Sequence, residues 1–272
     1  MNAHGQHRVT DPFGGVPDGA SPVLALTVLV SLAAILAYGV IASQAGGVRW
    51  PVRRFWFFAV GTIGVAWSTL AVAYGPAVMV GHVVGMMVAP AFLVLARPLR
   101  LILRSCSPDD RRRARRVVLM LRRLHGHRSV GWAVVEYVLS MALMLLTPLM
   151  AVLGGSVAAH VAVALYMAVC GVGFYSAVLG IGSGGSRASE AVRRMSARRA
   201  GAGMVAVGVT IAAGLGWGGA STADGVVLMS VGGAAGLFGV AAVRWHDESH
   251  DCNPRRQGSR RRLRAPHLVR GA

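Results

Sequence analysis

The sequence predicts an all-α polytopic membrane protein, a bundle of seven transmembrane helices. Three observations lead to this fold class. The 272-residue chain is 54% hydrophobic with a mean hydropathy of +0.56, which is too apolar for an ordinary soluble domain. Seven apolar segments have roughly the 20 residues that a helix needs to cross the hydrocarbon core. All 28 basic residues are arginines, and they gather in alternate connections between these segments.

The apolar segments can be justified in chain order. The first is a retained span and not a signal peptide, because its leading flank holds only Arg8 against Asp11 and Asp18 and the positive charge follows it. Gly75 and Pro76 separate the second segment from the third and predict a tight turn. Glycines lower the hydrophobicity of the sixth segment. The seven predicted spans are residues 22–42, 55–74, 77–96, 130–152, 157–181, 200–217 and 225–243.

The arginines predict how these spans are oriented. The connections after the first, third and fifth spans hold three, eleven and five arginines, and the C-terminal tail holds eight. The connections after the second, fourth and sixth spans hold none, so 27 of the 28 arginines fall on one side. Because positive loops stay in the cytoplasm, the predicted topology is N-out, C-in, in the inner (plasma) membrane. Since topology explains the basic residues, they do not indicate nucleic-acid binding.

Three regions are expected. They are an extracytoplasmic tail (1–21), a membrane domain (22–243) with a basic cytoplasmic loop (97–129), and a basic tail (244–272) expected to be disordered. Ser107 and Pro108, followed by two acids, have the composition of a helix start. The run to Leu124 mixes arginine with apolar residues, which predicts an amphipathic cytoplasmic helix on anionic lipid. A solvated charge run is the alternative.

Polar residues inside the spans are few, and two of them are histidines. His82 lies about six residues into the third span and His160 about four into the fifth. Both spans enter from the outside, so the two imidazoles are expected at similar depth, with Asp224 at the outer start of the seventh span. Ionisable groups at such depth usually serve a function. A neutral imidazole hydrogen-bonded between helices is the alternative for each histidine.

Sulfur atoms accompany these histidines. Met79, His82 and Met86 share one helical face, and Met167 follows His160 by seven residues. Cys170 lies deeper on the same segment as His160. Imidazole with thioether, and a thiolate in addition, suits Cu(I), because soft sulfur ligands favour that ion. Core filling is the common alternative role for methionine.

Other features carry less chemistry. Cys106, Cys170 and Cys252 are far apart and form no zinc or disulfide pattern. Gly81 with Gly85, and Gly232 with Gly236, form GxxxG pairs that indicate close helix packing. Glu136 lies near the cytoplasmic side of the fourth span, where a partner arginine is expected in preference to a proton path.

The stretch MVGHVVGMMVAPAFLVLARPLRLILR (79–104) resembles the seven-span CtaG family of assembly factors for haem–copper cytochrome c oxidases. That family has a His-x-x-x-His pair followed by Ala-Pro and a second proline, and here Ala89-Pro90 and Pro98 occupy those places. Further similar stretches occur in the family order over most of the chain. They are GVRWPVRRFWFF (47–58), TPL (147–149), the glycine and aromatic run 170–180 and VRWHDE (243–248).

The sequence departs from the family pattern at its histidine pairs. His82 matches the second member of the first pair, with Val78 in place of the first member. His160 matches the first member of the second pair, with Ala164 in place of the other. Residues 221–225 replace the acidic and glutamine motif before the last span, with Asp224 as the nearby acid.

The resemblance implies an integral membrane factor without a catalytic cycle. It would assist maturation of cytochrome c oxidase, with oxidase subunits as partners, and handle copper at the outer face through His82 and His160, with Met79, Met86, Met167 and Cys170 as further ligands. A scaffold that has lost the metal and a small-solute transporter are the alternatives. The spans show no internal repeat and no charged midplane cluster to favour a transporter, and no nucleophile–base motif favours an enzyme.

Overall fold

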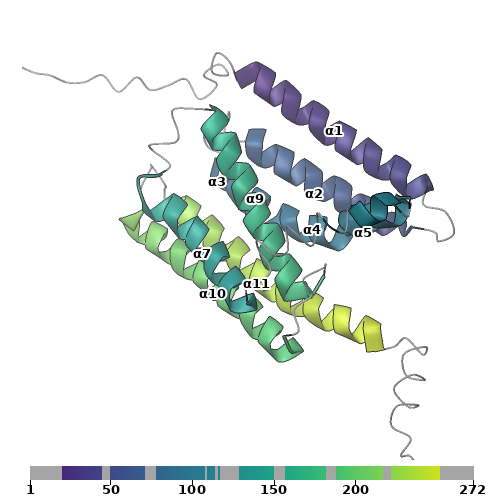
Figure 1. Cartoon of the computed structure of the whole chain (residues 1–272). Helices are drawn as coiled ribbons and strands as arrows, with labels where there is room; N and C mark the ends of the chain where they lie inside the picture. The colour runs from purple at the N-terminus through teal and green to yellow at the C-terminus, as the bar shows by residue number, and fades with distance from the viewer. Residues whose placement is uncertain are drawn as a thin grey trace, which may run out of the picture.

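The computed structural model describes residues 20–44, 50–70, 78–107, 109–113, 116, 129–149, 157–181, 188–216 and 222–251. Within these ranges every regular element is helical and no strand occurs (Figure 1). The elements are α1 (Ala20–Gln44), α2 (Val52–Leu70), α3 (Val78–Val83), η3 (Val84–Val88), α4 (Ala89–Ala96), α5 (Pro98–Ser105), α7 (Val130–Leu146), α9 (Val157–Leu179), α10 (Glu190–Thr210), η4 (Ile211–Leu215) and α11 (Thr222–Asp251). The all-helical class predicted from the sequence is therefore confirmed.

Each predicted span coincides with a helix or with a run of joined helices. Four segments are long and apolar enough to cross a membrane: Pro22–Gln44, Val80–Ser105, Val161–Leu179 and Thr222–Val243. The helix Val130–Leu146 is apolar but shorter. Length and composition therefore support the membrane-helix character of the chain. The count of seven crossings and their orientation stay predictions.

Two helices extend well beyond the predicted spans. α10 begins at Glu190, ten residues before the predicted start, because the Ser189 side chain accepts a hydrogen bond from the Val192 amide and caps the helix there. α11 continues to Asp251, so the first eight residues of the expected C-terminal tail are helical. Residues 1–19 and 252–272 lie outside the described residues.

The predicted helix start in the basic loop has the expected cap. The Asp110 amide donates to Ser107 Oγ at 3.2 Å, and Ser107 Oγ donates to Asp110 Oδ2 at 2.7 Å. This reciprocal pair satisfies a free amide of the first turn. The rest of the expected amphipathic helix, apart from residues 111–113 and 116, lies outside the described residues.

The third predicted span contains a π-helical turn, η3, between α3 and α4. Pro90 cannot donate a hydrogen bond to the carbonyl of Met86, and its ring would crowd that carbonyl in a regular α-helix. The helix widens instead, and the Ala89 amide donates to the Val84 carbonyl, five residues back. Such single π-turns are frequent at functional sites. This turn carries Met86 and Met87.

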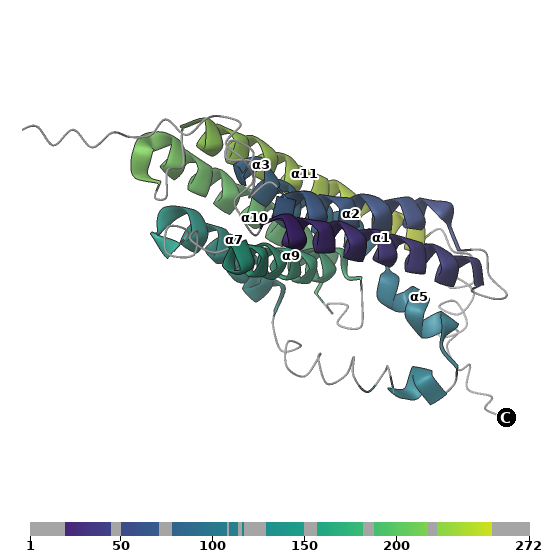
Figure 2. The same cartoon turned by 90° about the horizontal axis from the view of Figure 1, so that it is seen from above.

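α10 and α11 form the most extensively packed helix pair, lying side by side in Figure 2. A Cβ atom added to Gly201 would lie 2.9 Å from the Cα of Gly236. One added to Gly232 would meet the Cβ of Met204 at 2.5 Å. The glycines thus let the two backbones approach closely, which confirms the packing role predicted for Gly232 and Gly236.

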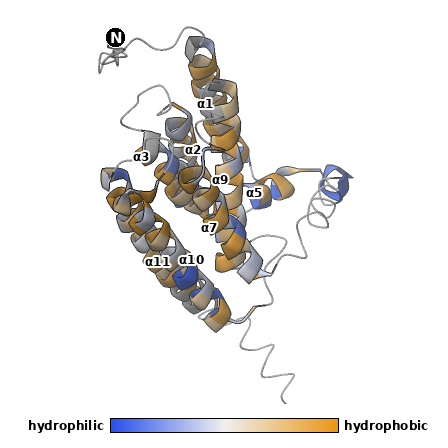
Figure 3. Cartoon of the chain, turned by 90° about the vertical axis from the view of Figure 1, so that its left-hand side faces the viewer, coloured by the Kyte–Doolittle hydropathy of each residue, from blue (hydrophilic) through white to orange (hydrophobic). Residues whose placement is uncertain are grey.

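α1 stands at the edge of the bundle and has almost no buried residues. Only 6% of its apolar segment is buried, against 50% for Val161–Leu179 of α9. Figure 3 shows hydrophobic colour along most of α1. An exposed apolar helix of this length is what a lipid-facing span requires.

Candidate functional site

Five methionines from four different segments form a cluster in the centre of the bundle, here called the methionine cluster. Each side chain is between 0% and 2% exposed. η3 supplies two of them, and α7, α9 and α10 supply one each. The members of the cluster are Met86, Met87, Met141, Met167 and Met204.

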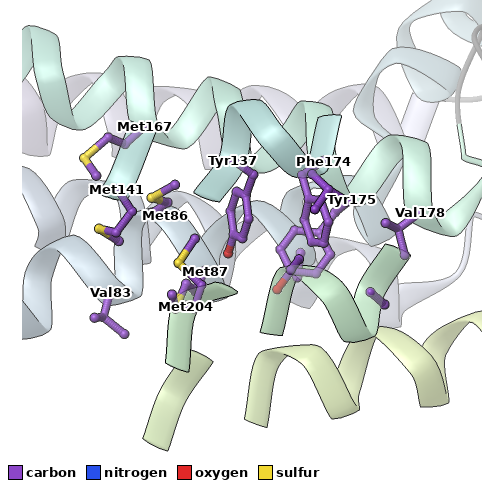
Figure 4. Close-up of a cluster of buried hydrophobic side chains, with 14 of the residues drawn as sticks. Val83, Met86, Met87, Tyr137, Met141, Met167, Phe174, Tyr175, Val178 and Met204 are labelled. Carbon is purple, nitrogen blue, oxygen red and sulfur yellow. The ribbon is translucent and has the colours of Figure 1, made fainter. Parts of the chain in front are cut away.

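Aromatic rings border this cluster on one side. The ring of Tyr137 stacks on Phe174, with centroids 4.3 Å apart, and Tyr175 approaches Tyr137 edge-on at 6.4 Å. Figure 4 shows all five methionines to one side of the Tyr137 ring, and Phe174 and Tyr175 to the other. The core is therefore divided into a sulfur-rich part and an aromatic part.

The Tyr137 hydroxyl lies at the boundary between these two parts. It is fully buried, and it makes no hydrogen bond of ordinary geometry with another described residue, although the neighbouring Tyr175 also carries a hydroxyl. A buried hydroxyl without a good partner is costly and uncommon in native cores. It gives the cluster one polar oxygen beside five thioethers.

The position of α9 relative to η3 is set by Gly171. A Cβ atom there would overlap the carbonyl oxygen of Met86 and would lie 2.6 Å from Cγ of Pro90. The lack of a side chain brings α9 directly onto the π-turn. Met86 and Gly171 are therefore level with each other, and Met167 of α9 reaches the same cluster as Met86.

This register bears on the two predicted histidine ligands. At about 1.5 Å per residue, His82 lies about 6 Å from Met86 toward the start of α3, whereas His160 lies about 16 Å from Gly171 toward the start of α9. The backbone thus places Met167, and not His160, level with His82. His82 is buried, at 5% exposure, whereas the side chain of His160 lies outside the described residues. Their ligand roles stay predictions.

The remaining predicted ligands occupy different surroundings. Cys170 is buried on α9, one helical turn after Met167. The side chain of Met79 on α3 lies outside the described residues. Asp224 is half-buried in the first turn of α11, where the helix dipole stabilises a negative charge, and Glu136 is half-buried on α7.

The methionine cluster is chemically neutral and soft. Three or more histidine, cysteine or acidic side chains do not converge anywhere among the described residues. The five buried methionines share one part of the core (Figure 4), and thioether ligands suit Cu(I) better than Zn²⁺ or Mg²⁺. Met87, Met141 and Met204 were not predicted as candidates, because each lacks a histidine at helical spacing on its own segment. Only the packing of different helices brings them to Met86.

The chain was compared with known proteins. A family model described as cytochrome c oxidase caa3 assembly factor (Caa3_CtaG) matches residues 34–235. This range runs from within α1 to within α11 and includes the whole methionine cluster. No curated protein and no solved structure matches the chain.

Proposed function

The chain belongs to the cytochrome c oxidase caa3 assembly factor family, and on this premise we propose that it serves assembly of a haem–copper oxidase by handling Cu(I) within its bundle. The family match carries the assembly role. The methionine cluster supports the choice of ion, because thioethers bind Cu(I) without needing a charged ligand. Copper is here the cargo of the protein, and no catalytic cycle is required.

The proposed ligands centre on Met86 and Met167, with His82 beside them. All three side chains are buried. The backbone register makes His82 level with Met167, and Met86 lies about one helical turn from that level. His160, Met79 and Cys170 complete the proposed set, with the first two nearer the outer end of the bundle and Cys170 one turn beyond Met167. An ion entering from outside would thus pass from imidazole to thioether ligands.

Copper titration tests the cargo. Purified protein in detergent would be titrated with Cu(I) against a chromogenic chelator, and the Met86→Leu/Met167→Leu and His82→Ala/His160→Ala variants would be compared with wild type. We expect each variant to bind less Cu(I). Leucine matches methionine in volume, so the fold is retained. Met195→Leu is the control, because that side chain is 47% exposed on α10. Equal stoichiometry in all proteins would show that these residues do not bind the ion, although the assembly role could survive.

Deletion of the gene tests the assembly role separately. We expect lower oxidase activity, with less copper in the oxidase and haem content measured in parallel. Restoration by wild type but not by Met86→Leu/Met167→Leu would link the cluster to assembly. Normal oxidase activity in the deletion strain would contradict the assembly role, whatever the copper titration shows.

The membrane arrangement proposed with this function has seven spans, with the N-terminus outside and the C-terminus in the cytoplasm of a plasma membrane. Oxidase subunits and anionic lipids on the cytoplasmic side are the proposed partners. Native cysteines test the topology, because it places Cys106 and Cys252 inside. A membrane-impermeant maleimide should label them only after permeabilisation, whereas an added Gly218→Cys should react in intact cells. Labelling of the wild-type protein in intact cells would overturn this topology.

A further inference from the structure

A buried hydrogen-bond chain joins three segments at one end of the bundle. Trp50, just before α2, donates from Nε1 to the hydroxyl of Tyr38 on α1 at 2.9 Å. That hydroxyl donates in turn to the carbonyl of Ala96, the last residue of α4, at 2.8 Å. Trp50 and Tyr38 are 9% and 4% exposed. These two hydrogen bonds fix the backbone next to Arg97, where α4 ends and α5 begins.

Arginines surround this hydrogen-bond chain. The guanidinium carbons of Arg54 and Arg104 lie 4.5 Å and 5.8 Å from the centroid of the Trp50 ring, within cation–π range. Arg97 and Arg100 are close enough to Arg54 to repel its charge. These four residues, from α2 and from the α4–α5 junction, are here called the arginine cluster.

Among the described residues, no carboxylate compensates the positive charge of the cluster. None of its four members forms an ion pair there, whereas Arg112 pairs with Asp109 and Arg194 with Glu190. Burial, and then repulsion from Arg97 and Arg100, lowers the pKa of Arg54 to about 10. At neutral pH the guanidinium therefore remains charged, and a bound anion would relieve the repulsion.

The backbone is arranged to keep these charges together. Arg97 has φ +55° and ψ +50°, the left-handed conformation, which a non-glycine residue seldom adopts. This residue ends α4, and Pro98 then starts α5 in a new direction, so Arg100 and Arg104 follow on a separate short helix. A local conformation of this kind persists only when its surroundings stabilise it.

α5 has the surface of a helix at a membrane interface. It exposes the apolar residues Leu99 and Ile102 together with Arg100 and Arg104, while Leu101 is buried. Figure 3 shows hydrophilic and hydrophobic colour together on this short helix. Figures 1 and 2 show it at the end of the bundle where α1 ends and α2 begins. An amphipathic helix with arginines beside exposed leucine and isoleucine suits the boundary between headgroups and acyl chains.

We propose that Arg54, Arg97, Arg100 and Arg104 form a binding site for the phosphate of an anionic membrane lipid, whose acyl chains lie against Leu99 and Ile102. Guanidinium groups match phosphate oxygens in geometry and charge. Trp50 and Tyr38 hold the site in place. The inference rests on the membrane location proposed above but not on copper or on the oxidase.

Native mass spectrometry of the full-length protein in detergent tests the site. Phosphatidylglycerol and phosphatidylcholine would be titrated into wild type, Arg54→Gln/Arg97→Gln/Arg100→Gln and a control, Arg194→Gln/Arg198→Gln/Arg199→Gln. The control removes the same charge from α10, where Arg198 and Arg199 are exposed and Arg194 is half-buried. We expect wild type and control to bind phosphatidylglycerol in preference to phosphatidylcholine. The cluster variant should lose about 100-fold in affinity for phosphatidylglycerol, since each of the three arginines near an anionic lipid surface contributes roughly a factor of five.

Three other results would each contradict the proposal. Equal losses in the control and the cluster variant would show only a net-charge effect. Equal binding of both lipids would remove headgroup recognition. Displacement of the lipid by millimolar inorganic phosphate alone would assign the site to a free anion. If the triple variant does not fold, Arg100→Gln replaces it, because that side chain is exposed and a smaller loss of the same lipid preference is then expected.

Discussion

The methionine cluster and the arginine cluster are built in opposite ways. The methionine cluster gathers neutral, polarisable side chains with at most 2% exposure from η3, α7, α9 and α10. The arginine cluster gathers charged side chains at the start of α2 and at the junction of α4 and α5, held by two buried aromatic residues with hydrogen-bonding groups. Apolar packing brings the methionines together. The hydrogen bonds of Trp50 and Tyr38 instead hold the backbone that carries the arginines, despite the repulsion between their charges.

The difference indicates what each region can recognise. Thioethers tolerate complete burial because they need no hydrogen bond, so their cluster can hold a soft ion inside the bundle. Guanidinium groups need water, an acid or a phosphate, so their cluster must lie at an interface. The two proposed sites thus differ in kind, a soft-ion site in the core and an anion site at one end.

The largest effect is expected where close backbone contact forms the methionine cluster. Gly171→Leu would drive a side chain into the carbonyl of Met86 and into Pro90, so we expect a stability loss above about 4 kcal/mol and no folded protein on size exclusion. Gly173→Leu is the matched control, because a Cβ there meets nothing within 4 Å. Equal recovery of both variants would contradict the register between α9 and η3.

A smaller loss should follow removal of one sulfur side chain. Met86→Ala leaves a cavity in a fully buried site, and we expect about 2–5 kcal/mol less stability in thermal or denaturant unfolding in detergent. Met195→Ala should change stability by less than about 0.5 kcal/mol, because that side chain is exposed. A loss for Met86→Ala as small as that of the control would show that the cluster is loosely packed.

The hydrogen bonds from Trp50 to Tyr38 and from Tyr38 to Ala96 are expected to contribute less to stability than core packing does. Tyr38→Phe leaves the Ala96 carbonyl and the Trp50 indole without their partner, at a cost of about 1–3 kcal/mol. Unfolding followed by circular dichroism would measure this loss. The same variant should weaken phosphatidylglycerol binding while Cu(I) binding stays unchanged. A change in Cu(I) binding would show that the arginine cluster and the methionine cluster are coupled.

The smallest effect is expected at the Tyr137 hydroxyl. Because that group lacks a well-aligned partner among the described residues, Tyr137→Phe should leave stability unchanged or raise it by about 1 kcal/mol. The measurement is the unfolding temperature in the absence of copper. A clear decrease would show that the hydroxyl is hydrogen-bonded, with the adjacent Tyr175 as its nearest candidate.

Most of the fold could be predicted from the sequence, because apolar length and helix caps are local properties. The predicted segments 22–42, 130–152 and 157–181 begin within two residues of α1, α7 and α9. The long extension of α10 was missed, since its first turns are rich in arginine and do not look like a span. The π-turn was missed although Pro90 was visible, because a proline does not specify how a helix accommodates it.

The candidate site was predicted only in part. His82, Met86 and Met167 were found from their spacing on single segments. Met141 and Met204 were not found, because their importance depends on neighbours from other helices. The arginines of the connections after the first and third predicted spans were assigned to one side of the membrane. That assignment did not show that Arg54 and Arg97 come close in space.

The sequence by itself determined that this chain is helical, that it has membrane-type helices and that its arginines alternate between connections, because hydrophobicity and charge act residue by residue. Only the tertiary structure decided which side chains meet. Gly171 against Met86 and Tyr38 against Ala96 join residues that are far apart in sequence. Such contacts depend on the register and rotation of whole helices, which no local pattern encodes.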